Sequence, residues 1–384
     1  MYIGITAEWN PFHEGHSYMI QKIKELYPEA PIAAVMSGAF TQRGEPAIFD
    51  KWTRAKWAVY HGIDAVIEFP VLYALQSADI FAENAVFLLS ELGCTHIAFG
   101  AESMSLSDLK NISSWSLTEE YKTCFHELLS KGVSYSSAIT QSIEIKFPQI
   151  GQELRKPNNL LGFRYVRAAE KQNLSLSFII VRRSSLHPAS ATKARESLLS
   201  GGTYPLLTDI VKKEAEQLIK SGHFLSYSRY EDACLLINKR LSEQQLTATG
   251  LFREGLEHRW FKNMKETSWN KALEQIKNKR YLYSRLKRIG AALLVSEQIP
   301  SPFMQKKKAA YARLLALRET ESHILKQSRL PIISNTAGAY KKLSSDDLSI
   351  LSLDLQSTDI QNFCMENQEY RKGREDFYKS PVII

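Results

Sequence analysis

The stretch Asn10-Pro11-Phe12-His13-Glu14-Gly15-His16 decides how the chain is organised. It follows an apolar run at residues 2–7 that is typical of a buried strand. It precedes residues 17–26, where apolar side chains recur at three- and four-residue spacings and therefore predict a helix. In an open α/β sheet, the loop between a strand and its helix lies at the carboxyl end of the strand, where ligands bind.

Two histidines give this loop the pattern of a phosphate site. His13 and His16 are three residues apart, so in a helical turn they share a face. The following helix N-terminus offers free N–H groups and the positive end of the helix dipole. Pro11 stiffens the loop, and Gly15 lets a ligand approach the backbone. A pair of structural, helix-capping histidines is the alternative, but the position between strand and helix favours a nucleotide. The pattern resembles the H-x-G-H signature of the nucleotidyltransferase superfamily.

The apolar runs farther along the chain predict the rest of the sheet. Four more strands are expected, at residues 31–38, 64–70, 95–100 and 176–181. Between them the patterns predict helices near 50–61, near 78–92 and within 105–172. Apolar strands separated by helices are typical of a parallel sheet covered on both faces. We therefore expect an α/β fold, a Rossmann-like doubly wound parallel sheet of the nucleotidyltransferase type, followed by a mainly helical basic domain. No G-x-G-x-x-G follows the first strand, which argues against dinucleotide binding.

The composition is that of a globular protein. Of 384 residues, 44% are hydrophobic and 23% charged. The sequence has no run of 18 apolar residues, and its first residues lack the pattern of a signal peptide. We therefore expect a cytoplasmic protein with no membrane partner. Four scattered cysteines form no C-x-x-C pair and are expected to be buried thiols: Cys94, Cys124, Cys234 and Cys364.

Charge is unevenly distributed along the chain. The net charge is +8, yet residues 1–100 hold 6 basic and 11 acidic side chains, and residues 253–329 hold 18 basic and 7 acidic ones. Aromatic residues lie among the basic ones of the second segment, which suits an RNA backbone and unstacked bases. A solvated charged helix is the alternative. The Gly-rich stretch 201–205 is the expected linker, which predicts a nucleotide-binding catalytic domain at 1–203 and a helical basic domain at 204–384.

Further candidate residues follow the last predicted strand. Ser190 and Thr192 at a helix start, with Arg195 one turn on, make a second phosphate cradle. Arg182 and Arg183 end the strand itself, where guanidinium groups can stack on adenine or pair with phosphate. A second cradle after an H-x-G-H loop is typical of adenylyl transfer, in which the β- and γ-phosphates need a site of their own.

Other candidates lie at neighbouring strand ends. Gly100 ends the fourth predicted strand and would let the nucleotide lie against bare backbone. Asn158 and Asn159 follow a proline and can hydrogen-bond a base or ribose, although Asn is also a common helix N-cap. The loop after the second strand places Arg43 near the same sheet edge, with an ordinary polar loop as the alternative.

Together these stretches resemble one family, the bacterial tRNA(Met) cytidine acetate ligases, over nearly the whole chain. The matching stretches are residues 8–16, 36–46, 156–159, 190–195, 254–259, 279–281 and 285–286. The resemblance implies that ATP activates acetate as acetyl-adenylate, and that the acetyl group passes to N4 of the wobble cytidine of elongator tRNA(Met). It implies ATP-binding residues Thr6, Ala7, Glu8, Trp9, Asn10, Pro11, Phe12, His13, Glu14, Gly15, His16, Gly100, Asn158, Asn159, Arg182, Arg183, Ser190 and Thr192. It implies tRNA-binding residues Lys279, Arg280, Arg285, Lys287 and Arg288.

In the implied reaction, His13, His16 and Arg195 are the catalytic residues. The imidazoles stabilise charge on the α-phosphate, and Arg195 holds the departing pyrophosphate. Acetate needs no general base, because its carboxylic acid has a pKa near that of Glu, about 4.3. Mg²⁺ would bridge the phosphates of ATP, although no motif marks a metal site. The sequence does not indicate an oligomeric state.

Two other functions remain as alternatives. A small-molecule adenylyltransferase of the pantetheine-phosphate or nicotinamide-mononucleotide type would share both phosphate motifs, but it leaves the basic second half unexplained. A non-catalytic RNA-binding protein would explain that half, but the intact His13, Gly15, His16 and Arg195 argue against it.

Overall fold

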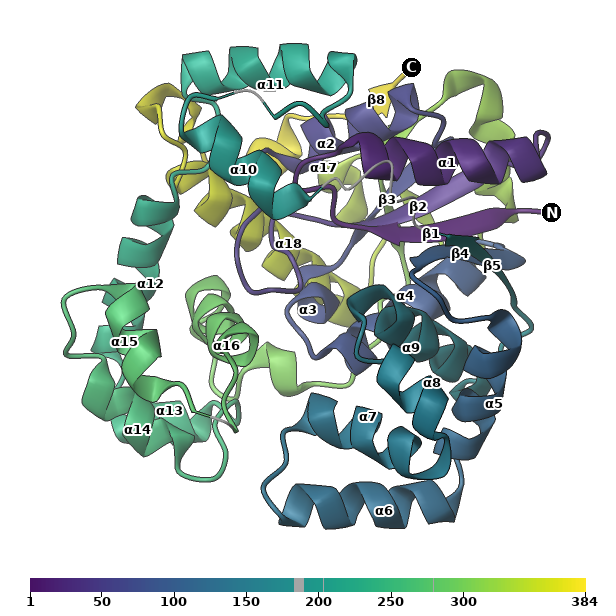
Figure 1. The fold of residues 1–384 in the computed structure, drawn as a ribbon. Coiled ribbons are helices and arrows are strands. Elements are labelled where there is room, and N and C mark those ends of the chain that lie inside the picture. The colour runs from purple at the N-terminus through teal and green to yellow at the C-terminus, as the bar shows by residue number, and fades with distance from the viewer. Residues whose placement is uncertain (183–189, 203, 279) are drawn as a thin grey trace.

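A computed structural model describes residues 1–182, 190–202, 204–278 and 280–384. At its centre is an eight-stranded sheet with the main order β5-β4-β1-β2-β3-β6-β7 (Figure 1). The five expected strands are confirmed: β1 (Ile3–Ala7), β2 (Ile32–Ser37), β3 (Ala65–Phe69), β4 (His96–Ala101) and β5 (Ser177–Arg182). They pair in parallel. The strand order reverses at β1, which has β2 on one side and β4 on the other, and ligands bind at such a reversal.

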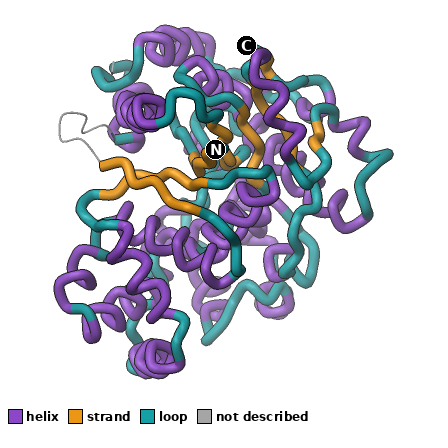
Figure 2. The backbone as a smooth tube through the Cα atoms, turned by 90° about the vertical axis from the view of Figure 1, so that its right-hand side faces the viewer, coloured by secondary structure: helices purple, strands orange, loops and turns teal. Residues whose placement is uncertain are grey.

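Helices cover both faces of this sheet, as the doubly wound fold predicts. Along β2, Ile32, Ala34 and Met36 belong to one buried core, and Ala33 and Val35 belong to the other. Alternate side chains of a strand point to opposite faces, so each face has its own core. One core contains residues of α1 (Glu14–Leu26), α2 (Lys51–Tyr60), α10 (Ala191–Leu199) and α11 (Asp209–Ser221). The other contains residues of α4 (Ala78–Glu91), α5 (Leu106–Ser116) and α9 (Pro157–Lys171). Figure 2 shows the strands between these two sets of helices.

The chain beyond residue 300 returns to the sheet. Strand β6 (Ala312–Leu317) pairs antiparallel with β3, so the sheet is mostly parallel rather than wholly so. Strand β7 (Ile332–Ile333) pairs with β6, as does β8 (Val382–Ile383). The pattern of the sequence did not single out β6. The sheet therefore draws strands from both sides of residue 204.

Two groups of helices extend from the central sheet. One, at the lower right of Figure 1, contains α6 (Glu119–Ser130), α7 (Tyr135–Lys146) and α8 (Pro148–Glu153). The other, at the lower left, contains α12 (Tyr227–Arg240), α13 (Glu243–Ala248), α14 (Leu256–Asn263), α15 (Trp269–Ile276) and α16 (Tyr283–Val295). We call this second group the helical lobe. Its interior is built on Trp260 and Trp269, whose ring centroids are 5.8 Å apart.

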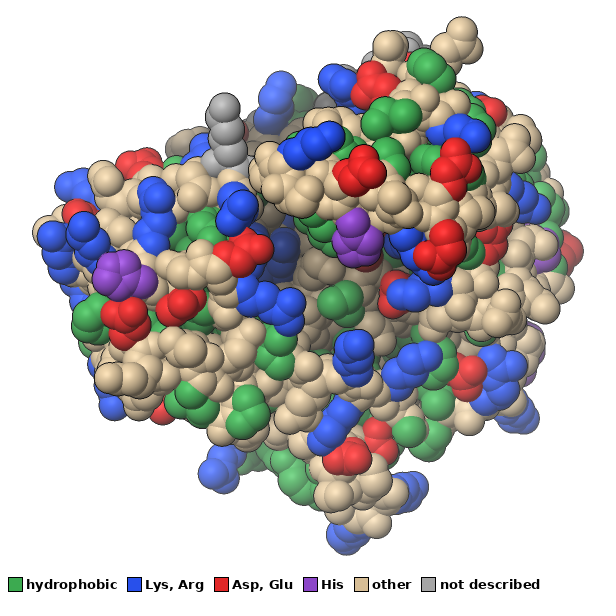
Figure 3. All heavy atoms as spheres, turned by 90° about the horizontal axis from the view of Figure 1, so that it is seen from below, with side chains coloured by type: hydrophobic (Ala, Val, Ile, Leu, Met, Phe, Trp, Pro, Cys, Tyr) green, Lys and Arg blue, Asp and Glu red, His purple; other side chains and the backbone are tan. Residues whose placement is uncertain are grey.

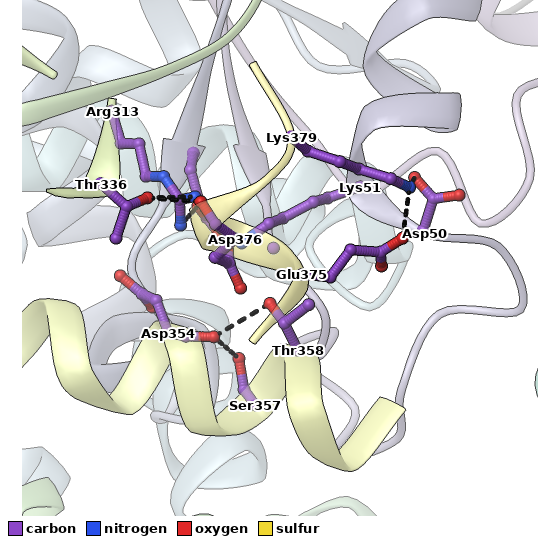
Figure 4. A network of polar contacts seen from close by, with 12 residues as sticks. Asp50, Lys51, Arg313, Thr336, Asp354, Ser357, Thr358, Glu375, Asp376 and Lys379 are labelled. Atoms are coloured by element: carbon purple, nitrogen blue, oxygen red, sulfur yellow. Dashed lines mark hydrogen bonds and ion pairs between the residues drawn. The ribbon is translucent and has the colours of Figure 1, made fainter. Parts of the chain in front are cut away.

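Buried charges attach the C-terminal segment to the sheet (Figure 4). The Lys51 ammonium lies 2.7 Å from carboxylate oxygens of both Glu68 and Asp376. Arg313 of β6 also contacts both carboxylates, at 3.0 and 2.6 Å. Two cations and two anions balance one another, so the group is neutral although nearly all of it is buried. Removing one member would leave an uncompensated buried charge, which typically costs about 3–5 kcal/mol.

Two short helices, α3 (Val71–Ala74) and α17 (Thr336–Ala339), lie near the sheet, and the long helix α18 (Ser345–Phe363) packs beside α3. Within the described ranges, no helix combines the length and the apolar character needed to cross a bilayer. The four cysteines are free thiols, and all but the half-buried Cys124 are buried.

Candidate active site

The loop between β1 and α1 places the two histidines against each other. His13 is the N-cap of α1, and its backbone N–H donates to His16 Nδ1 over 3.2 Å. The imidazole rings stack with their centroids 3.6 Å apart and their planes 10° from parallel. His13 is buried and His16 half-buried. Both imidazoles therefore lie at the positive end of the α1 dipole, where an anion is favoured.

Aromatic rings pack around this histidine pair. The ring of Phe12 is fully buried, with its centroid 5.4 Å from that of His16 and 4.5 Å from that of His61. Trp9 also contacts Phe12, at 5.7 Å between centroids, and has a left-handed backbone with φ of 43°. This packing restricts the movement of the imidazoles, as a preorganised site requires.

A buried arginine ties together the ends of β1 and β2. Arg54 of α2 is fully buried. Its guanidinium donates to the carbonyl oxygens of Glu8 (2.6 Å), Ser37 (3.0 Å), Phe49 (3.1 Å) and Gly38. Burial lowers the pKa of Arg54 to about 10, which still leaves it protonated at neutral pH. A charged donor shared among these carbonyls fixes the loops after the two strands relative to each other.

The loop after β2 reaches the histidine loop through Glu8. The backbone N–H of Gln42 donates to Glu8 Oε1 over 2.7 Å. Burial raises the pKa of Glu8, while the Gln42 hydrogen bond and the guanidinium groups of Arg43, Arg54 and Arg195 oppose that shift. Three arginines thus act on one carboxylate at the carboxyl edge of the sheet, and their combined positive charge favours an anionic ligand there.

The second expected phosphate cradle lies beside the first. Arg195 of α10 donates from Nη1 to the backbone oxygen of Asn10 over 2.6 Å, and from Nη2 to Thr192 Oγ1 over 3.4 Å. Ser190 is the N-cap of α10, and its Oγ accepts from the N–H of Lys193. The structure therefore brings two helix N-termini, with two imidazoles and a guanidinium, to the same loop.

Residues that the sequence analysis missed complete these surroundings. The hydroxyl of Tyr165 in α9 hydrogen-bonds with Thr6 Oγ1 at the end of β1. Tyr227, the first residue of α12, lies near Arg195 and Asn10, and burial raises its pKa to about 12. Like Arg54, these tyrosines lie in ordinary helical patterns, so no signal in a single sequence marks them.

The side chain of Asn159 hydrogen-bonds to the protein backbone on both of its polar atoms. Its side chain is fully buried, and its Oδ1 accepts from the N–H groups of Glu102 and Ser103 over 3.0 and 3.3 Å. Its Nδ2 donates to the backbone oxygen of Glu153 over 2.9 Å. Asn159 therefore positions the loop after β4 and has no exposed surface for a base or ribose. Asn158 is half-buried, and its Nδ2 donates to Glu102 Oε1 over 2.7 Å.

The other strand-end candidates lie on β4 and β5. Gly100 pairs with Val181 in the parallel ladder, and Arg182 pairs with Ala101 at the same edge. Arg182 is exposed. Arg183 lies outside the described residues.

Two of the basic residues expected to bind tRNA lie in the first turn of α16 or just before the helix. Arg280 is exposed and forms an ion pair with Glu254 at 3.4 Å. The guanidinium of Arg285 lies over the ring of Tyr281, 5.2 Å from its centroid. Lys279 lies outside the described residues.

The next two basic residues of α16 contact the loop after β2 directly. Lys287 forms an ion pair with Glu45, and Arg288 Nη1 donates to the backbone oxygen of Gln42 over 3.3 Å. Gly44 has φ of +82°, and a Cβ atom there would lie 2.4 Å from the backbone nitrogen of Arg288. The helical lobe is therefore in close contact with the same loop that Glu8 holds.

The residues that the structure describes include no group of three or more His, Cys, Asp or Glu side chains that could hold a metal ion.

Comparisons with known proteins find full-length similarity. The family described as HIGH Nucleotidyl Transferase matches residues 1–376. A protein named tRNA(Met) cytidine acetate ligase from Clostridium novyi is 32% identical, with 99% of each chain covered. The protein of the same name from Bacillus velezensis is 30% identical, over 99% of this chain and 96% of the other. A crystal structure of Thermotoga maritima TmcAL bound with alpha-thio ATP is similar, with a TM-score of 0.92 and 29% identity over 100% of this chain and 99% of that one.

Proposed function

Because the chain belongs to the tRNA(Met) cytidine acetate ligases of the HIGH nucleotidyl transferase family, we propose that it uses ATP and acetate to acetylate elongator tRNA(Met) at N4 of the wobble cytidine. The similarity covers both the sheet and the helical lobe. A relative that binds an ATP analogue has the same fold at a TM-score of 0.92, which supports ATP as the activating substrate here.

In the first step an oxygen of acetate attacks the α-phosphorus of ATP. The bond from that phosphorus to the bridging oxygen of the β-phosphate breaks, and pyrophosphate leaves. His13 and His16 donate to the oxygens of the α-phosphate as negative charge grows there. Arg195 and the N-terminus of α10 hold the pyrophosphate, with Ser190 and Thr192 as hydroxyl donors.

In the second step the N4 amine of cytidine attacks the carbonyl carbon of acetyl-adenylate. The bond between that carbon and the phosphate oxygen breaks, AMP leaves, and the amine loses one proton. The mixed anhydride is already reactive, so the protein contributes mainly by placing the base beside it. The target cytidine must leave its stack to reach the carboxyl edge of the sheet.

Other parts of the proposal follow from this reaction. Mg²⁺ would be held by the phosphates of ATP and would neutralise part of their charge, since Mg²⁺ in nucleotide sites relies largely on substrate oxygens. The nucleotide site belongs mainly to residues 1–203, and the tRNA site to the helical lobe within residues 204–384. We propose that the reaction takes place in the cytoplasm.

One observation carries the proposal: the stacked imidazoles of His13 and His16 lie in the same loop that Arg195 contacts at Asn10. The test is to incubate the protein with ATP, labelled acetate and tRNA(Met), and to analyse the nucleosides by mass spectrometry. We expect N4-acetylcytidine at the wobble position, together with AMP and pyrophosphate. Bound tRNA that gains no acetyl group would contradict the proposal.

A small-molecule adenylyltransferase fits the same two phosphate sites but gives the helical lobe no role. Incubation with ATP and either phosphopantetheine or nicotinamide mononucleotide separates the two functions. We expect no adenylylated product from either compound.

A further inference from the structure

The start of α12 carries two tyrosines whose hydroxyl groups lie in different surroundings. Tyr230 donates its O–H to the backbone oxygen of Gly44 over 2.9 Å, in the loop after β2. The hydroxyl oxygen of Tyr227 is also buried, yet within the described residues it has no hydrogen-bond partner. A buried hydroxyl without a partner is unfavourable, so this state is expected where a ligand completes the bonding.

Hydrogen bonds hold the start of α12 against the histidine loop. The N–H of Leu225 donates to the backbone oxygen of Ile48 over 2.8 Å. The N–H of Ile48 donates to Asn10 Oδ1 over 2.9 Å, and the backbone oxygen of Asn10 accepts from Arg195 over 2.6 Å. Tyr227 follows Leu225 by two residues. Its hydroxyl therefore lies near Asn10 and Arg195, in the loop expected to bind the phosphates of ATP.

The neighbours of the Tyr227 hydroxyl offer donors and leave its own proton without an acceptor. A guanidinium group such as that of Arg195 has five N–H donors and accepts nothing. Asn10 already accepts on both of its oxygens, from Ile48 at Oδ1 and from Arg195 at the backbone. Burial raises the pKa of Tyr227 to about 12, although the positive charge of Arg195 opposes the rise. At neutral pH the proton therefore stays on Tyr227, and its acceptor must come from outside.

The acceptor that fits these surroundings is a phosphate oxygen. Arg195 and the N-terminus of α10 favour a negative charge, and a phosphate oxygen accepts from O–H as well as from N–H. Glu45 is the carboxylate that acts on Tyr227, but it forms an ion pair with Lys287. Figure 3 shows a hollow on the face seen from below, with Lys and Arg side chains around it, so the field on that face also attracts anions.

A phosphate reaches this position when one weak contact opens. Thr192 is exposed and Arg195 half-buried, and Nη2 of Arg195 donates to Thr192 Oγ1 over 3.4 Å, which is long for a hydrogen bond. A phosphate that replaces this contact binds Arg195 and leaves its 2.6 Å bond to Asn10 intact. Binding in this way brings the phosphate toward Tyr227, whose hydroxyl lies near the same guanidinium.

We propose that the Tyr227 hydroxyl donates a hydrogen bond to the β- or γ-phosphate of ATP that Arg195 binds, and to pyrophosphate as it leaves. Tyr227 is then a catalytic residue supplied by the helical lobe, since α12 is the first helix of that lobe (Figure 1). The inference rests on the proposed function and adds to it a contact between the lobe and the nucleotide. The hydroxyl keeps its proton throughout, so it stabilises charge by hydrogen bonding alone.

The experiment uses Tyr227→Phe, which removes only the hydroxyl group. Loss of a hydrogen bond to a charged group typically weakens binding by about tenfold or more, so the dissociation constants of ATP and of inorganic pyrophosphate should rise by that factor in calorimetry. AMP has no β- or γ-phosphate, and its dissociation constant should stay within about twofold of wild type. In acetate-dependent ATP–pyrophosphate exchange, the KM for pyrophosphate should rise and the KM for acetate should stay unchanged.

Stability distinguishes this role from a structural one, and Tyr230→Phe is the matched control. Because the Tyr227 hydroxyl has no partner among the described residues, Tyr227→Phe without nucleotide should unfold at a urea concentration equal to or above that of wild type. Tyr230→Phe removes the donor to Gly44, so its urea midpoint should fall while its affinity for pyrophosphate stays within about twofold of wild type. Saturating ATP should raise the midpoint of wild type more than that of Tyr227→Phe.

Four results would overturn the inference. Wild-type affinity for ATP and pyrophosphate in Tyr227→Phe would mean that the hydroxyl contacts neither. An equal loss of affinity for AMP would place the hydroxyl at the α-phosphate or the nucleoside. Unchanged affinity for pyrophosphate with weaker binding of tRNA(Met) would assign the hydroxyl to a phosphate of RNA. A urea midpoint as low as that of Tyr230→Phe would show a structural role.

The outcome for wild type separates this inference from the proposed function. Wild-type protein that forms N4-acetylcytidine while Tyr227→Phe gives one of these four results refutes the inference alone. Wild-type protein that binds ATP and pyrophosphate but forms no N4-acetylcytidine refutes the proposed function, and the affinities of Tyr227→Phe still decide whether the hydroxyl contacts a phosphate.

Discussion

The Arg195 guanidinium donates to the backbone oxygen of Asn10 over 2.6 Å, although the two residues are 185 positions apart in the chain. Asn10 in turn accepts from the N–H of Ile48 through its side-chain Oδ1, over 2.9 Å. One residue therefore links the histidine loop, the start of α10 and the segment before α2. The sites proposed for the α-phosphate and for pyrophosphate keep a fixed separation because both are attached to the same loop.

Replacing His16 by alanine removes one of the two stacked imidazoles. Loss of a preorganised donor to a developing charge typically lowers the rate by about 10²–10³. We expect a loss of this size in acetate-dependent ATP–pyrophosphate exchange by His16→Ala, with tRNA affinity close to wild type. The control is His323→Ala, since His323 is exposed in the C-terminal part of the chain. Exchange at the wild-type rate in His16→Ala would remove the role assigned to this side chain.

Replacing Arg54 by methionine keeps most of its volume but removes the donors to four carbonyl oxygens. Three of these carbonyls lie at the ends of β1 and β2, and the fourth, that of Phe49, precedes α2. All four would lose a partner that water cannot easily replace. We expect the free energy of unfolding to fall by about 3 kcal/mol, measured by urea denaturation. The KM for ATP should also rise, because Glu8 and the loop after β2 lose their shared anchor. A stability like that of the surface variant Arg329→Gln would contradict this account of Arg54.

Local patterns were enough to predict the five strands from β1 to β5 and the histidine loop, because each strand is a continuous apolar run followed by a helix. They did not reveal β6. Its residues 312–317 lie in a basic segment without a neighbouring β–α pattern, and its partner β3 is about 250 residues earlier in the chain. Pairing between strands so far apart in the chain depends on the tertiary structure, so no local sequence pattern predicts it.

The same reason explains the site residues that were missed or reassigned. Arg54 lies in the helix expected near residues 50–61, and no local pattern marks it because its carbonyl partners lie on other elements. Asn159 looked like a ligand-facing amide next to a proline, but its buried contacts with the loop after β4 occupy it. The spacing of residues in the sequence indicates which side chains share a helical turn. It does not indicate which side of that turn is buried against other parts of the protein.

The buried carboxyl group of Asp354 in α18 should make the protein less stable as the pH rises from about 4 to 8. Burial, and next the charge of Glu68, raises the pKa of Asp354 to about 8, although Lys51 and Arg313 act in the opposite direction. An unfolded Asp has a pKa of about 3.9. Between about pH 4 and 8 the folded state therefore holds a proton that the unfolded state has lost, so this group lowers stability as the pH rises.

Asp354→Asn removes this titration and keeps an oxygen for the N–H of Val71, which now donates to Oδ1 over 2.6 Å. We expect the stability of the variant relative to wild type to increase from pH 5 to pH 8, measured by urea denaturation at each pH. Asp346→Asn is the control, because Asp346 is an exposed carboxylate of the same helix. Parallel pH profiles for wild type and Asp354→Asn would show that Asp354 does not titrate in this range.

The loop after β2 approaches the helical lobe so closely at Gly44 that a larger residue does not fit there. A Cβ atom at this position would lie 2.4 Å from the backbone nitrogen of Arg288, and φ of +82° is itself unfavourable for alanine. We expect Gly44→Ala to lower the free energy of unfolding by about 2 kcal/mol or more. Since the displaced contact lies between the nucleotide site and α16, acetyl transfer to tRNA(Met) should fall more than ATP–pyrophosphate exchange.

Gly201→Ala is the control for this variant. It is matched in backbone strain, with φ of +76°, but nothing lies within 4 Å of the added atom. It should lose only about 1–2 kcal/mol, with the ratio of transfer to exchange unchanged. Equal losses and equal ratios in the two variants would show that the contact between Gly44 and α16 has no part in transfer.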